Sequence, residues 1–320
     1  MLKFIGRRLV SYVAMLFVAT SATYFLASWF LDPRSNYLAM RPQPSDASID
    51  KSLDYANIND QTPLIERYGE WVKGIVLHLD FGKSPQGEPI NEVLWHRALI
   101  SLELVTIATI LAIVIGISVG VATAIRKYSL FDRTANAISV LFLVTPTFVI
   151  GLLVALVYLR FHESTGMNPL YVTGPIEGGF LDFFRYIALP TLTLTLAGYV
   201  SYHFTQRTYL LDTINDDYVR TARAKGLRKN VAIRRHALRT SLIPTAMGVA
   251  LSITTIVTGS VFVEKIFSIN GAGYYFIDTL SKNDINGTVA VAFLGGVATC
   301  VGLLLADLAI AMLDPRIRIS

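Results

Sequence analysis

The sequence predicts an all-α membrane protein that crosses the bilayer several times. Of its 320 residues, 53% are hydrophobic and only 16% are charged, against roughly 25% charged residues in soluble domains. Six stretches are apolar enough to cross a hydrocarbon core, which takes about 20 helical residues. Basic residues are concentrated in the loops between them. Helices are expected rather than open strands, because lipid offers no partner for an unpaired backbone group.

The spans define the domain organisation. A short N-terminal segment and the first span occupy residues 1–31, a long loop occupies 32–98, and a core with five further spans occupies 99–320. The first span has no charge over 9–31, which favours a retained signal anchor over a cleaved signal peptide. The core spans are predicted at 99–125, 134–159, 186–206, 244–263 and 289–313, with a cytoplasmic segment at 207–243.

The loop charges predict that both termini are cytoplasmic. With the N-terminus inside, the inner segments carry 17 Lys and Arg residues and the outer segments 11. Seven of the 11 lie in the 67-residue loop 32–98, which is long enough for its charges to count little in orientation. Without that loop, the inner segments carry 17 Lys and Arg residues and the outer segments carry four. The positive-inside rule therefore accounts for the net charge of +5 better than a nucleic-acid partner does.

The long outer loop is expected to contain one short amphipathic helix. Between Pro63 and Leu79, apolar residues such as Leu64, Tyr68 and Trp71 recur at helical spacing. This helix would lie along the outer membrane surface. A disordered connector is the alternative.

Few ionisable residues lie inside the predicted spans. Glu103 and Asp307 can both reach the interfacial region, so no relay of carboxylates crosses the midplane. Their scarcity weakens the hypothesis of a stand-alone secondary transporter. Pro146 and Pro190 interrupt the third and fourth spans, where they could act as gating pivots or only shape the packing. Glycines in the spans could allow close helix contact or line a pathway.

The most informative stretch is the basic segment, which has nine Lys and Arg residues against three acids over 205–243. Asp216 or Asp217 can cap a helix, and Gly226 can supply the left-handed position that ends it. A second helix is expected over 229–240, with Pro244 as the first residue of the fifth span. Binding to anionic lipid, or a role in topology alone, would need charge but not this order of caps and helices.

This segment resembles the signature of membrane permease subunits of ABC importers, in the version found in the peptide and nickel group. The resemblance covers nearly the whole chain in order, and the long outer loop is similar to that of B-type oligopeptide and dipeptide permeases. The matching motifs are Arg220-Thr-Ala-Arg-Ala-Lys-Gly226-Leu, Arg235-His236-Ala237-Leu238-Arg239, Leu242-Ile243-Pro244, Asp80-Phe81-Gly82, Ser101-Leu102-Glu103-Leu104, Thr145-Pro146-Thr147-Phe148, Leu189-Pro190-Thr191, Glu264-Lys265-Ile266-Phe267-Ser268 with Gly271-Ala272-Gly273, and Leu313-Asp314-Pro315-Arg316.

The motif departs from the broad importer pattern Glu-Ala-Ala-x3-Gly in two places. Arg220 and Thr221 stand at its first two positions, and only Ala222 and Gly226 match. The spacing from the glycine to the following proline is also longer. Both departures are typical of the peptide group, so they concern the subfamily.

The resemblance implies the type I ABC importer permease fold in the plasma membrane of a prokaryote. It also implies a second, C-type permease subunit, two ATP-binding subunits and an external solute-binding protein as partners. ATP and Mg would be bound by the partner ATPases. The substrate would be a peptide, with nickel or glutathione as alternatives. The coupling helix, over 216–227, would dock in an ATPase through Tyr218, Arg220, Thr221, Ala222, Arg223, Lys225, Gly226 and Leu227.

Two observations from the residues agree with a non-catalytic transport subunit. The chain has no G-x-x-x-x-G-K-[ST] loop to hold ATP phosphates. It also lacks the H-E-x-x-H pattern expected of an intramembrane metallohydrolase. We therefore expect ATP hydrolysis on partner chains.

Overall fold

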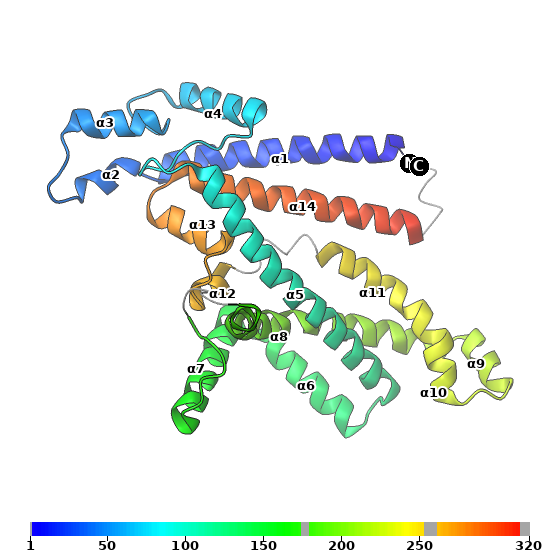
Figure 1. Cartoon of the computed structure of the whole chain (residues 1–320). Coiled ribbons are helices and arrows are strands. Elements are labelled where there is room, and N and C mark those ends of the chain that lie inside the picture. Colours follow the sequence, from blue (N-terminus) through cyan, green and yellow to red (C-terminus); the bar gives the residue numbers. More distant parts are fainter. Residues whose placement is uncertain (1, 174–178, 253–260, 314–320) are drawn as a thin grey trace. The chain divides into compact units, whose positions relative to one another are not determined.

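A computed structural model describes residues 2–173, 179–252 and 261–313. These residues are mostly helical and contain no β-strand (Figure 1). They divide into two compact units. Of the described residues, unit 1 comprises 2–102, 261–265 and 269–301, and unit 2 comprises the rest.

Unit 1 contains two long helices that lie side by side, α1 and α14 (Figure 1). A Cβ atom on Gly296 of α14 would lie 2.5 Å from Cδ1 of Leu16 on α1, so the small residue permits this close approach. The helices of this unit are α1 (Leu2–Phe30), α2 (Pro33–Leu38), α3 (Asp46–Tyr55), α4 (Leu64–His78), the start of α5 (Ile90–Ile125), most of α12 (Val261–Ile266), α13 (Ala272–Ser281) and most of α14 (Ile285–Leu313).

The long loop 32–98 contains three short helices. One of them, α4, lies within the range 63–79 where an amphipathic helix is expected. The other two, α2 and α3, were not predicted. Asp32 caps α2 by accepting from the Arg34 N–H at 3.1 Å, and α3 buries Ile49 and Leu53 in one core with Trp71 of α4. The i, i+4 spacing of these two residues is a helical signal, although it is only one turn long.

Unit 2 is organised around α8 (Phe180–Thr213), which packs against α6, α7 and α11 (Figure 1). Its other elements are the rest of α5, α6 (Leu130–Val144), α7 (Thr147–Thr165), α9 (Asp217–Ala224), α10 (Lys229–Ala232), the π-helix η1 (Ile233–Ala237) and α11 (Leu238–Ser252).

The interruption predicted at Pro146 in the third span, 134–159, is present. The chain forms two helices there, α6 and α7, separated at Thr145 and Pro146. Thr145 has φ −87° and ψ 122°, which is extended backbone. The physical cause is that the ring of a proline disfavours the helical conformation of the residue before it.

The prediction that Pro244 is the first residue of a helix is wrong. The helical backbone runs from Lys229 through η1 to Ser252, so Pro244 lies inside α11 instead of starting a new helix. Pro fixes φ near the helical value in both places, which is why the sequence did not distinguish them. Residues 253–260 of the fifth predicted span, and the closing motif after Leu313, lie outside the described residues.

Five described helices are long and apolar enough to cross a membrane: Gly6–Phe30, Ile90–Ile125, Thr147–Thr165, Phe180–Thr213 and Ile285–Leu305. Two of them extend well beyond the apolar stretches seen in the sequence. α5 begins at Ile90 instead of 99, and α8 covers 180–213 instead of 186–206. A membrane helix continues past the hydrocarbon wherever its polar turns find partners, so hydropathy gives its apolar part only. The six-span topology stays a prediction.

Candidate functional site

The helix α9 begins at Asp217, directly after Asp216 at the N-cap position. Asp216 has an extended backbone, with φ −65° and ψ 152°, but its side chain makes no capping hydrogen bond. Its carbonyl oxygen accepts from the N–H groups of Val219 and Arg220 at 3.0 and 3.1 Å. The predicted cap is therefore correct in position but not in its side-chain hydrogen bond.

The other end of α9 is a Schellman turn. The Gly226 N–H donates to the carbonyl of Arg223 at 3.0 Å, and the Leu227 N–H donates to that of Ala222 at 3.3 Å. Gly226 has φ +93°, a left-handed conformation that glycine adopts without steric cost. The predicted left-handed glycine is confirmed, and it turns the chain sharply toward α10.

One face of α9 is buried in the core of unit 2. Val219 and Ala222 are only 1% and 8% exposed. They lie in a cluster with Ala124 of α5, Leu210 of α8 and Ile233 of η1. This packing fixes the buried face of α9 to α5, α8 and η1.

The opposite face of α9 is open and basic. Five of the eight residues predicted to couple are exposed side chains on this surface: Tyr218, Arg220, Thr221, Arg223 and Lys225. Arg220 lies 3.6 Å from Asp217, but an ion pair between two exposed side chains contributes little. The buried Ala222 and the half-buried Leu227 instead pack in the cluster that holds α9 against α5, α8 and η1.

A π-helical turn follows α9 and α10. In η1, Ile233 and Ala237 are buried on one side, while Arg234 and Arg235 are exposed. The Leu238 N–H donates to the Ile233 carbonyl, five residues earlier. Single π turns are rare and are frequently found at functional sites.

A buried glutamine joins α8 to α11. Gln206 is fully buried, and its Nε2 donates to Oγ of Ser241 at 2.9 Å. Its Oε1 accepts from Oγ1 of Thr245 at 2.7 Å. We call these three residues the α8–α11 clasp. Both polar ends of the amide are satisfied, so the clasp fixes the register of the two helices.

An ion pair joins α8 to the start of α6. Nε and Nη2 of Arg207 donate to the two carboxylate oxygens of Asp132 at 3.0 and 3.1 Å, a bidentate geometry. Burial alone raises the pKa of Asp132, but the hydrogen bonds from Arg207 and the Tyr128 N–H outweigh it, so this pKa lies below its ordinary value. Asp132 is therefore an anion at neutral pH.

A third polar contact and two glycines hold α5 and α6 against α8. The buried ring of His203 lies 2.7 Å from Oγ of Ser139 and 3.2 Å from Oγ1 of Thr123. A Cβ atom on Gly116 would lie 2.5 Å from the carbonyl oxygen of Tyr199, and one on Gly120 would lie 2.7 Å from that of His203. At Gly116 and Gly120, the absence of a side chain therefore allows close contact between α5 and α8.

Comparison with known proteins assigns the chain to a family. The family described as binding-protein-dependent transport system inner membrane component matches residues 112–319. The oligopeptide transport system permease protein OppB of Mycobacterium tuberculosis (strain ATCC 25618 / H37Rv) is 35% identical over 328 residues, with 100% of both chains covered. The chain belongs to this family.

Two further relatives extend the comparison. The oligopeptide transport system permease protein AppB of Bacillus subtilis (strain 168) is 33% identical to the permease over 286 residues, or 88% of each chain. The dipeptide transport system permease protein DppB of Lactococcus lactis subsp. cremoris (strain MG1363) is 32% identical over 321 residues, with 100% of each chain covered. With its five long apolar helices, the permease is a multi-pass membrane protein.

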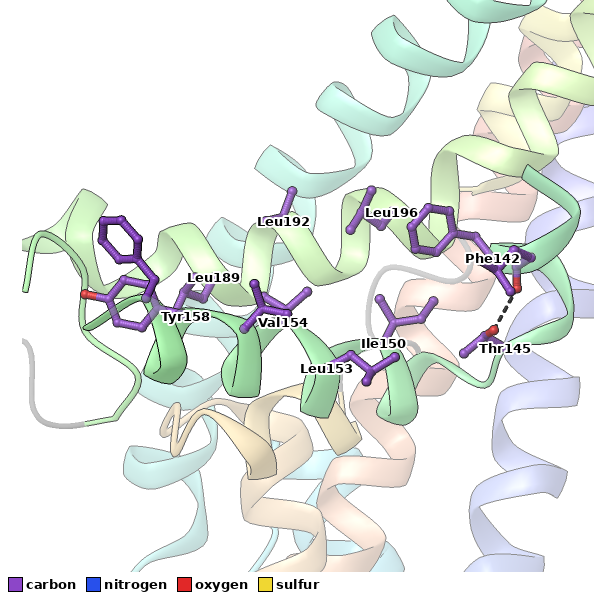
Figure 2. A pocket seen from close by; sticks show the side chains of 12 residues that line it. Phe142, Thr145, Ile150, Leu153, Val154, Tyr158, Leu189, Leu192 and Leu196 are labelled. Atoms are coloured by element: carbon purple, nitrogen blue, oxygen red, sulfur yellow. Dashed lines mark hydrogen bonds between the residues drawn. The ribbon is translucent and has the colours of Figure 1, made fainter. Parts of the chain in front are cut away.

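The two prolines predicted as pivots lie in different settings in the permease. Pro146 is the N-cap of α7, and Pro190 is buried inside α8. Beside Pro146, α6, α7 and α8 enclose an apolar groove of about 610 Å³. Figure 2 shows Leu153 and Val154 of α7 and Leu192 of α8 along this groove, with Oγ1 of Thr145 donating to the Leu141 carbonyl at 2.7 Å. A pivoting role for either proline stays a prediction.

Sequence reasoning did not single out the clasp or the Asp132–Arg207 pair. A polar side chain in or beside an apolar stretch is a signal for such contacts, and Gln206 ends a predicted span. The sequence alone does not say which of the surrounding hydroxyl and carboxylate groups is its partner, because the partners come from distant segments.

Proposed function

We propose that this permease is a translocation subunit of an ATP-driven ABC importer for peptides. It would form half of a pathway together with a second permease subunit of the C type, in the plasma membrane of a prokaryote. The full-length similarity to oligopeptide and dipeptide permeases supports peptides as the substrate class. An external solute-binding protein would deliver the peptide, in keeping with the description of the family.

We further infer that α9 is the coupling helix for two cytoplasmic ATP-binding subunits. The observation that carries this is the asymmetry of α9. One face is fixed in a core with α5, α8 and η1, and the other presents exposed basic and aromatic side chains. Closure of the ATPases would move α9 as a rigid body, and the helices packed on it would follow.

In this proposal the chain is not an enzyme. ATP and Mg would be bound and ATP hydrolysed on the partner subunits. The chain itself would contribute six spans, both termini on the cytoplasmic side, and the pathway. The lipid bilayer would surround its spans.

The test is a charge reversal on the open face of α9. R223E keeps the buried face and the Schellman turn, since the Arg223 side chain is exposed and only its carbonyl takes part in the turn. We expect the tagged variant to reach the membrane with its partner permease but to lose most of the co-purifying ATPase subunits and peptide uptake. K127E is the control, because Lys127 is an exposed basic residue outside α9.

The two variants separate coupling from general electrostatics. If R223E retains ATPase binding and uptake at the level of K127E, α9 is not the coupling helix. If both variants lose the ATPases equally, overall charge holds the complex together and the docking assignment is wrong.

A further inference from the structure

Unit 1 contains a cavity, lined mostly by polar and charged residues, outside the site described so far. It has a volume of about 390 Å³ and is lined by Glu92, Val93, His96, Arg97 and Asn270. The first four are on the first turns of α5, and Asn270 is in the loop before α13. In the predicted orientation this end of α5 is on the outer side of the membrane, where a transported solute arrives.

Arg97 is held in this cavity by neutral groups. Its Nη1 donates to Oδ1 of Asn270 at 3.4 Å, and its guanidinium carbon lies 5.3 Å from the ring centroid of Tyr275. These contacts orient the half-buried side chain but leave its charge uncompensated. Among the described residues, no carboxylate forms an ion pair with it. A guanidinium has five donors in a planar fork that suits a carboxylate.

The loop that carries Asn270 is rigidly attached to α5. Oγ of Ser101, one turn beyond Arg97, accepts from the Ala272 N–H at 2.8 Å and donates to Oε1 of the buried Glu264 at 2.6 Å. A Cβ atom on Gly271 would lie 2.4 Å from that same hydroxyl oxygen. The geometry around Arg97 is thus preorganised, which lowers the entropic cost of binding a ligand.

Glu92 adds a carboxylate to the same cavity. It is exposed, and among the described residues it forms no ion pair. Glu92 and Arg97 both line the cavity, so a single ligand can meet a carboxylate and a guanidinium there. A ligand with an ammonium group at one end and a carboxylate at the other complements both charges.

We propose that this cavity receives a zwitterionic dipeptide, with Arg97 binding its terminal carboxylate and Glu92 its terminal ammonium group. The proposal rests on the proposed function and names the chemical class of the substrate. A simple anion is disfavoured, because Glu92 repels it.

The test uses the full importer complex in proteoliposomes with internal ATP and excess binding protein. Uptake is compared for a free dipeptide, its C-terminal amide and its N-acetyl form. Each uptake rate is divided by the amount of binding protein that has bound that compound. In the wild type we expect the free dipeptide to enter at least about tenfold faster than either blocked form, a usual effect of losing one charged hydrogen-bonding partner. R97Q should slow the free dipeptide by a similar factor and remove the preference over the amide. E92Q should remove the preference over the N-acetyl form.

The matched control is R160Q, since Arg160 is 85% exposed on α7 and lies outside the cavity. R97K tests folding, because it keeps the charge and should restore part of the uptake. Equal uptake by R97Q and R160Q would overturn the proposal, as would a preference for the free carboxylate that survives in R97Q. Weaker binding of the binding protein itself to R97Q would instead assign Arg97 to a protein contact. A wild-type complex that transports no peptide in any form would overturn the proposed function itself.

Discussion

Gly226 and Gly116 lack a side chain for different physical reasons. Gly226 has φ +93° and open space where a Cβ atom would lie, so only its backbone conformation requires glycine. Gly116 shows no such φ, but a Cβ atom there would lie 2.5 Å from backbone of α8. One glycine is needed for a turn and the other for the contact between two helices.

We therefore predict that Gly226→Ala impairs coupling without unfolding the permease. A left-handed conformation costs a non-glycine residue roughly 1–2 kcal/mol, which weakens the Schellman turn locally. ATP-dependent uptake should fall while membrane levels stay near wild type. Gly226→Asn should retain more uptake than the alanine variant, since Asn tolerates this conformation. The idea fails if Asn and Ala variants behave alike.

Gly116→Ala should act on stability instead. The α5–α8 contact must open or shift, and overpacking of this kind costs about 1–3 kcal/mol. Thermal unfolding of the purified complex should show a lower Tm. Gly248→Ala is the matched control, because a Cβ atom on Gly248 meets nothing within 4 Å and alanine favours a helix by up to about 1 kcal/mol. An unchanged Tm in Gly116→Ala would contradict the close contact.

At the level of helices, polar contacts fix how α5, α6 and α11 lie on α8. The fourth predicted span is polar for a membrane helix, yet its residues Thr191, Thr193, Thr195 and His203 are buried within the protein. Gln206 contacts α11, Arg207 contacts α6, and His203 contacts α5 and α6. Such contacts specify register, which apolar packing alone leaves loosely defined.

Replacing the amide of the α8–α11 clasp should loosen these two helices. Gln206→Leu removes both hydrogen bonds, each worth about 0.6 kcal/mol on average between membrane helices. Ser241 and Thr245 keep backbone carbonyl acceptors at 3.1 and 3.3 Å, so neither hydroxyl is left without a partner. We expect a modest loss of stability and a larger loss of peptide-stimulated ATP hydrolysis. A double-mutant cycle with Thr245→Val measures the interaction, and a coupling energy of zero would exclude the clasp.

The Asp132–Arg207 pair should make stability depend on acid pH. The pKa of Asp132 is lower in the folded protein than in the unfolded chain, where it is about 3.9. The ionised pair therefore stabilises the fold fully above that value, and this stabilisation is lost as the pH falls through the folded pKa. Asp132→Asn should cost about 1.5–3 kcal/mol at pH 6. The difference in Tm between the two proteins should shrink by pH 3; a constant difference would refute the assignment.

At the scale of the whole molecule, the orientation in the membrane is the prediction that most needs a direct measurement. The basic loops place α9 inside, and the loop with α2 to α4 outside. In a Cys300→Ser background, an impermeant maleimide should label Ser45→Cys on intact cells. Thr221→Cys should react only after the membrane is opened. The reverse pattern would invert the topology and remove α9 from contact with ATPases.

Much of the molecule can be predicted from its sequence, for identifiable reasons. Long apolar stretches predict long helices, and Gly226 predicts where α9 ends, because these signals depend on a residue and its near neighbours. An interruption at Pro146 could be predicted because the effect of proline on the preceding residue is local. The sequence did not show that the interruption separates two helices, because hydropathy runs continuously across it. The prediction placed a helix boundary at Pro244, where the structure has a continuous helix. A proline at a helix start and one inside a helix have the same φ, so the residue type does not distinguish the two.

The helical class, the basic segment and the left-handed glycine can be read from the sequence alone, since each follows from composition or from the conformational limits of single residues. The tertiary structure decided which face of α9 is buried, that Gln206, Ser241 and Thr245 meet, and that Glu92 and Arg97 share a cavity with Asn270. These facts depend on residues far apart in the chain. Their partners are chosen by packing and by the need to satisfy buried polar groups, which a linear pattern does not contain.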